Sequence, residues 1–170
     1  MQAIVNAFWQ IALFRQGPDD LPDSRPLLML ASLAYVLVDA AIILILYPRQ
    51  ALLPLLLVDV GFLTLWSMGV LQLFGYGARL QRTLTALFGA GALLQVLAFP
   101  LSAWPALGIP FEIPLYLRLW ASLIILLWTI AVYAHVFSRS LTRSLGTGLL
   151  FSLVYFVVIY KFAAQWGQVS

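Results

Sequence analysis

Two aspartates are the residues of this chain whose type and position could do chemistry, because each lies inside a long apolar segment. Asp39 lies in LLMLASLAYVLVDAAIILILY, and Asp59 lies in ALLPLLLVDVGFLTLWSMGVLQLF. A charged carboxylate at the centre of a membrane helix costs about 2.5–3.5 kcal/mol, so an acid in this position indicates a function or a specific partner. Two acids in contact would share a proton, which suits a proton relay or a cation site.

The spacing of the two acids predicts that they lie at one depth in a membrane. Each acid is ten residues from Arg49, which belongs to the short turn expected at residues 47–50 between the two apolar segments. In an antiparallel helical hairpin, a rise of about 1.5 Å per residue places both carboxylates roughly 15 Å from the turn. That depth is close to the middle of a hydrocarbon core of about 30 Å. Equal depth does not by itself make the two acids face each other.

The same pair also has a purely structural interpretation, in which the acids hold the helices together as neutral groups or as ion pairs. Arg118 is the first candidate partner, because its long side chain can reach inward from the start of a later apolar segment. Lys161 is the second candidate. We favour the structural interpretation at this stage, since the apolar segments hold few other polar residues from which a pathway could be built.

The chain carries no pattern typical of catalysis, metal binding or cofactor binding. Cysteine is absent and His135 is the single histidine, so neither a thiolate metal site nor a haem site with two histidines is expected. HExxH, phosphate-loop and GxSxG motifs are also absent. We therefore predict a protein that is not an enzyme and has no cofactor, with His135 bonded to a backbone group near the end of a helix.

Composition indicates that the solvent around these residues is lipid. The 170 residues are 64% hydrophobic and 9% charged, and the mean hydropathy is +1.02, whereas soluble domains are typically about 25% charged. The net charge of +3 is spread over the segments between apolar stretches, so we interpret it as a topology signal and expect no nucleic-acid partner.

The elements that position the two acids are predicted to be membrane-spanning helices. We expect an all-α integral membrane protein with one domain at residues 27–166, built as a bundle of five transmembrane helices. A polar linker rich in Pro and Asp precedes it at residues 17–26, where Asp23 or Ser24 is placed to cap the first span. The spans are expected at about residues 27–47, 51–74, 83–101 (ended by Pro100), 115–137 and 145–164.

The first sixteen residues predict a short amphipathic helix. Gln2, Asn6 and Gln10 recur every four residues and form one polar stripe on an otherwise apolar helix that is too short to span a membrane. Such a helix either lies in the membrane interface or packs on the bundle, and the sequence leaves both alternatives open. At the other end of the chain, Tyr155 and Tyr160 are interpreted as aromatic residues of the outer membrane interface.

Two of the expected spans carry small residues that allow a close approach of another helix. The third span presents Ala86, Gly89 and Ala90, and the fifth has Ser144, Gly148 and Ser152 at every fourth position. These faces are candidate packing surfaces for neighbouring helices of the chain, of a second copy or of another membrane protein.

Basic residues predict the orientation of the chain in the membrane. With the N-terminus in the cytoplasm and the C-terminus outside, the outer face holds only Arg49, Arg118 and Lys161. Short connections between spans favour a bacterial inner membrane. The cytoplasmic face would hold six basic residues: Arg15, Arg25, Arg79, Arg82, Arg139 and Arg143.

From about Phe74 to Tyr160 the layout resembles the Yip-type membrane domain. The segment FGYGARLQRTLTALFGAGALLQVLAFPL is similar to the glycine-bearing loop and third span of that family, and LRLWASLIILLWTIAVYAHVFSRSLTRSL is similar to the start of its fourth span. The resemblance implies five spans, a cytoplasmic N-terminus and a role in organising other membrane components. The family has no established catalytic residues, so the resemblance implies none here.

Two functions remain from these observations. The first is a non-enzymatic accessory, scaffold or assembly subunit of a membrane complex, which contacts the lipid bilayer and either other membrane proteins or a second copy of itself. The alternative is a small proton or cation conduit, or a transporter subunit, that uses the intramembrane pair Asp39 and Asp59.

Overall fold

The computed structural model describes residues 2–46, 52–103 and 113–166, and it is helical throughout its regular elements. Five helices in these ranges are long and apolar enough to cross a membrane, which confirms the predicted fold class. The expected turn at residues 47–50, with Arg49, lies outside the described residues. The helices are α1 (Gln2–Ala12), α2 (Arg25–Leu46), α3 (Leu52–Leu73), α4 (Leu80–Ala103), α5 (Leu115–Leu141) and α6 (Leu145–Trp166).

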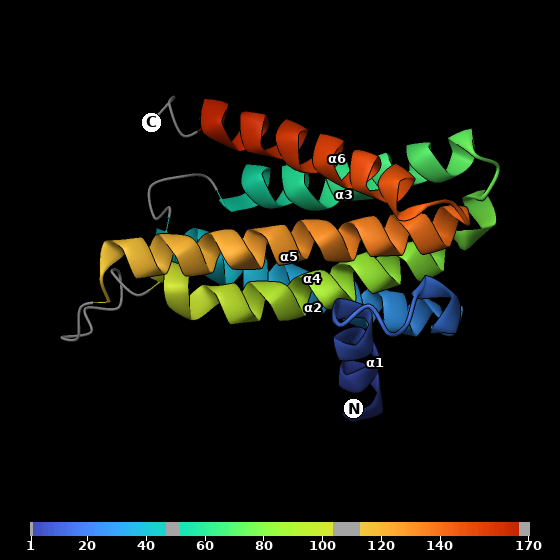
Figure 1. The fold of residues 1–170 in the computed structure, drawn as a ribbon, viewed down its shortest axis with the longest axis horizontal. Helices are drawn as coiled ribbons and strands as arrows, with labels where there is room; N and C mark the ends of the chain where they lie inside the picture. Colours follow the sequence, from blue (N-terminus) through green and yellow to red (C-terminus); the bar gives the residue numbers. More distant parts are fainter. Residues whose placement is uncertain (1, 47–51, 104–112, 167–170) are drawn as a thin grey trace.

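The five long helices lie alongside one another, and α1 lies crosswise to them (Figure 1). Helix α2 packs mainly on α4, and α5 packs mainly on α6, while α4 also contacts α5 and joins the two pairs. Helix α3 contacts α2, α4 and α6. The five spans therefore enclose a common interior to which each of them contributes a face.

Two helix ends differ from those expected. Helix α5 continues to Leu141, beyond residue 137, and ends at Thr142, which adopts a left-handed conformation with φ of 50° and whose N–H donates to the Arg139 carbonyl oxygen. The prediction that Pro100 ends the third span is wrong, because α4 continues to Ala103. Proline interrupts a helix by removing one backbone donor and crowding the preceding turn, and in the last turn little helix remains to be lost.

Both faces of small residues pack inside the chain. A Cβ atom on Gly148 would overlap the Ala134 carbonyl oxygen of α5, and the Ser152 hydroxyl donates to the Ile130 carbonyl oxygen at 2.8 Å. A Cβ atom on Gly89 would overlap the Phe8 ring of α1, and its neighbours Ala86 and Ala90 are fully buried. Ser144 is exposed at the start of α6. Gly148 thus allows α6 to lie against the α5 backbone, and Gly89 receives α1.

Helix α1 and the residues directly after it are held on the bundle by buried apolar side chains and by two side chains of α5. Ile11 and Ala12 are fully buried. The Trp128 indole N–H donates to the Ala12 carbonyl oxygen at 2.8 Å, and His135 Nε2 lies 3.0 Å from the Gln16 carbonyl oxygen. His135 therefore has the backbone partner that was expected. Helix α1 thus packs on α4 and α5, crosswise to the spans, and this position is also compatible with a place in the membrane interface.

The acidic linker after α1 pairs with basic residues at the same end of the bundle. Asp19 lies 3.8 Å from Arg139, and Asp23 lies 3.9 Å from Arg82. Ser24, one of the two predicted caps, accepts a hydrogen bond on its hydroxyl oxygen from the Leu27 N–H at 3.5 Å. The linker thus joins α1 to α2 and also lies across the ends of α4 and α5.

We predict that Gly148→Leu destabilises the protein because the added side chain must displace the α5 backbone. Overpacking of a close interface costs about 1–3 kcal/mol or more. The measurement is the thermal unfolding midpoint in mild detergent. Gly146→Leu is the matched control, because Gly146 lies on the same helix with only the exposed Ser144 hydroxyl near its Cβ position. Equal midpoints for the two variants would contradict the packing described here.

Candidate functional site

The two aspartates line one cavity in the interior of the bundle. Its volume is about 340 Å³, and all five long helices contribute to its wall. Asp39 lies fourteen residues after Arg25, where α2 begins, and Asp59 lies fourteen residues before Leu73, where α3 ends. Because α2 and α3 run in opposite directions (Figure 1), the two acids lie at about the same level of the bundle, as their spacing predicted. The polar wall consists of Tyr35, Asp39, Asp59, Gln95, Tyr133 and Tyr155, with Ser122 and Thr129.

Two tyrosine hydroxyls hold the Asp59 carboxyl group from opposite sides. Tyr35 of α2 donates to Asp59 Oδ2 at 2.7 Å, and Tyr155 of α6 donates to Asp59 Oδ1 at 3.2 Å. Both tyrosines are buried, at 4% and 2% exposure. The interpretation of Tyr155 as an aromatic residue of the membrane interface is therefore wrong, because its ring is in the core and its hydroxyl has a partner there. These bonds connect α2, α3 and α6 at one point.

Asp39 and Gln95, which both line the cavity, each carry a buried oxygen atom whose hydrogen bonding the chain does not satisfy. Asp39 Oδ2 and Gln95 Oε1 are fully buried and have no hydrogen-bond partner among the residues that the structure describes. A buried acceptor without a donor costs about 1–3 kcal/mol. The chain therefore carries two unsatisfied acceptors, from α2 and α4, in the same space.

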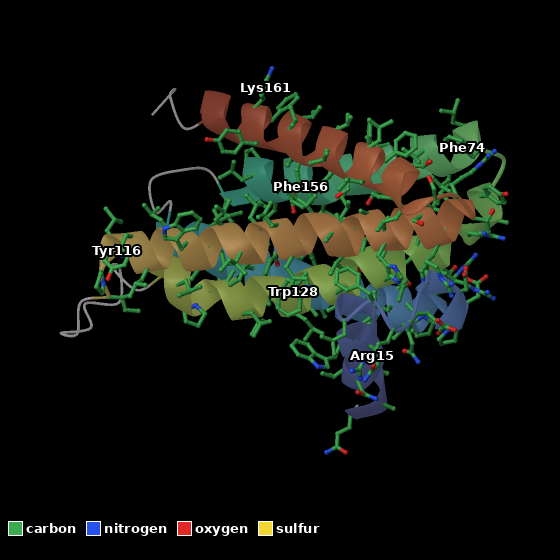
Figure 2. All side chains as sticks on the ribbon, in the orientation of Figure 1. Arg15, Phe74, Tyr116, Trp128, Phe156 and Lys161 are labelled. Carbon is green, nitrogen blue, oxygen red and sulfur yellow. The ribbon has the colours of Figure 1, made fainter. Side chains whose placement is uncertain are left out.

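The two basic residues proposed as ion-pair partners do not reach the acids. Within the described ranges, neither Arg118 nor Lys161 forms an ion pair with Asp39 or Asp59. Lys161 is exposed and points away from the bundle (Figure 2), and Arg118 is half-buried near the start of α5. No basic residue stands among the described residues that line the cavity. The tyrosines supply the hydrogen bonds for which the sequence had suggested cations.

Gly91 of α4 makes room for the tyrosine cluster. A Cβ atom at this position would lie 2.7 Å from the Tyr133 hydroxyl and 2.9 Å from the Tyr35 ring. Both distances are shorter than ordinary Cβ contacts, so a side chain at this position would force the two tyrosines to shift. The sequence held one signal for the cluster, since Tyr35 precedes Asp39 by one helical turn and lies on the same face. It held no comparable signal for Tyr133 and Tyr155.

The chemistry open to this arrangement is the binding of a cation or a proton. In the described part of the chain, no three His, Cys, Asp or Glu side chains gather where they could hold a metal ion. The wall offers carboxylates, an amide and phenols, and these groups can accept and relay protons or balance a positive charge.

Comparison with known proteins gives no relative from which a function could be taken. No family model matches the chain, and neither a curated protein nor a solved structure does. The resemblance to the Yip-type domain stays a prediction from sequence.

We predict that Tyr35→Phe lowers stability more than Tyr155→Phe does. Each substitution removes a hydroxyl donor from the buried Asp59 carboxyl group, at a cost of about 1–3 kcal/mol, and the Tyr35 bond is the shorter one. Thermal unfolding in detergent measures both effects. Tyr160→Phe on α6 is the control, because Tyr160 is 75% exposed. If Tyr35→Phe behaves like Tyr160→Phe, the hydrogen bond to Asp59 does not support the fold.

Proposed function

We propose that this polytopic membrane protein is a non-enzymatic conduit or carrier that binds a cation or a proton in its central cavity, with Asp39 and Asp59 as the binding groups. One observation carries the proposal: two acids from different helices share a cavity in which no basic residue lines the described wall. Buried acids that serve only to join helices would be expected to satisfy each other or an arginine. Here the Asp39 Oδ2 atom lacks a partner.

The shape of the cavity supports a pathway from one side of the membrane. Along α5 it extends from Tyr133 to the exposed Ser122, and eleven residues of helix correspond to roughly 16 Å. Towards the opposite end the bundle is closed by the fully buried side chains of Leu87, Val136 and Phe137. A cation would reach the acids from the end where α5 begins, and passage to the other side would require the closed end to open.

An accessory or assembly role receives less support from the same structure. The sequence supported that role through two faces of small residues that could receive another protein. Gly89 is covered by α1 and Gly148 by α5, so the chain itself occupies the central residue of each face. A partner or a second copy would have to bind the outer, lipid-facing surfaces of the spans.

We further propose that the N-terminus is cytoplasmic, in a bacterial inner membrane. The linker residues Asp19 and Asp23 contact Arg139 and Arg82, which places the start of α2, the start of α4 and the end of α5 at one end of the bundle. This end carries most of the basic residues, and basic ends of spans favour the cytoplasm. The part of the cavity wall nearest the start of α5 then lies on the outer side of the acids.

We predict that Asp39→Asn and Asp59→Asn each abolish cation or proton flux in proteoliposomes, while both variants still insert and fold. Asparagine keeps the size of the side chain and removes the charge or the exchangeable proton on which transport depends. Flux is measured with an internal pH-sensitive dye under an imposed ion gradient. Asp23→Asn is the matched control, because this acid is half-exposed and pairs with Arg82. Wild-type flux in both cavity variants would contradict the proposal.

The orientation has its own test, which the absence of cysteine makes simple. A membrane-impermeant maleimide should not label Ser144→Cys in intact cells but should label Tyr116→Cys, since these exposed residues lie at opposite ends of the bundle. Both variants should react after the membrane is permeabilised. Labelling of Ser144→Cys in intact cells would reverse the proposed topology.

A further inference from the structure

The wall of the cavity has a polar part and an apolar part. Asp39, Asp59 and Gln95 lie together with the tyrosine hydroxyls at the deeper end, as seen from the start of α5. Most of the remaining wall is hydrocarbon, from Ala98, Ile125, Leu126, Phe156 and Ile159. A ligand that fills this space must therefore combine a positive charge with an apolar body.

The charges of the cavity select for a cation. Two acidic side chains and one amide side chain line a space that no basic residue lines among the described residues. Tyr35 and Tyr155 donate to Asp59, whereas Asp39 Oδ2 and Gln95 Oε1, both fully buried, have no donor in the described chain. A cation beside Asp39 would balance its charge without disturbing the bonds of Asp59.

The same wall is poorly suited to a metal ion. Calcium takes about six to eight oxygen ligands, and magnesium requires near-octahedral coordination by about six. The cavity brings together two carboxyl groups, and the described residues contain no cluster of three metal-ligating side chains. Aromatic rings, in contrast, stabilise large organic cations, and Tyr35, Tyr133, Tyr155 and Phe156 all line this space.

The volume of the cavity agrees with an organic ligand. At about 340 Å³ it falls within the range of about 300–1,000 Å³ that is typical of small-molecule pockets. A bare ion would leave most of the apolar wall without a contact, while a ligand with hydrocarbon or aryl groups would cover it.

We propose that the cavity binds a monovalent organic cation with apolar substituents, of the quaternary ammonium or phosphonium class, with its charge beside Asp39 and Asp59 and its apolar groups against Ile125, Leu126 and Ile159. The inference rests on the proposed function, because it names the class of cation that the conduit or carrier would take.

The test uses tetraphenylphosphonium as the probe, bound to the full-length purified protein in mild detergent. Radiolabelled probe should bind saturably, and its affinity should fall by at least about tenfold in Asp39→Asn and in Asp59→Asn, since removing one member of a buried charge pair has a large effect. Leu126→Trp should also weaken binding by filling the apolar part while leaving both acids in place. Asp23→Asn should bind like the wild type.

A competition experiment distinguishes recognition of the probe's charge from recognition of its shape. Unlabelled tetraphenylphosphonium should displace the probe, whereas tetraphenylborate, with the same shape and the opposite charge, should not. Equal displacement by the borate, or unchanged affinity in both asparagine variants, would overturn the inference. Asp39→Asn decides the matter if Asp59→Asn fails to fold, because Asp39 Oδ2 carries no hydrogen bond in the described chain.

The outcomes also distinguish this inference from the proposed function. If flux of protons or inorganic cations depends on the acids while tetraphenylphosphonium does not bind, the inference fails and the proposed function stands. If neither flux nor binding depends on Asp39 or Asp59, both fail.

Discussion

The burial of the Asp59 carboxyl group is the constraint on which the rest of this bundle depends. An acid at mid-membrane level must find hydrogen-bond donors within the protein, because lipid offers none. Tyr35 of α2 and Tyr155 of α6 provide them. Helices α2, α3 and α6 must therefore meet at one level, each with its axial rotation fixed so that these side chains reach one another. A side chain at Gly91 would force Tyr133 and Tyr35 to shift, because both lie close to α4 at this position.

The end of the bundle away from the cavity is stabilised by different means. Fully buried apolar side chains fill the interior there, including Leu71, Phe137 and Leu141. The buried hydroxyls of Thr83 and Ser140 lie 2.8 Å apart and join α4 to α5. The molecule thus combines a tightly packed half with a half that contains a polar cavity.

Much of the fold could be predicted from the sequence because a helix that crosses a lipid bilayer must be long and predominantly apolar. Long apolar segments gave the spans, Ser24 marked the start of α2, and counting from the turn placed Asp39 and Asp59 at one level. The partners of the acids could not be predicted, since they depend on the rotation of each helix and on which helices become neighbours. Arg118 and Lys161 were the obvious candidates by charge, whereas neutral tyrosines in the core take that place for Asp59. Gly89 and Gly148 indicated close packing without indicating which helix would approach.

The docking of α1 has a consequence for the order in which this protein assembles. Its contacts are with Gly89 of α4 and Trp128 of α5, on helices that follow it by many residues in the chain. During synthesis α1 leaves the ribosome well before α4 and α5 have been made, so it cannot dock until they are in place. An amphipathic helix with its polar stripe at Gln2, Asn6 and Gln10 can wait on the membrane surface without aggregating. Docking of α1 would then be a late step of biogenesis, because it requires α4 and α5 to have inserted and packed together.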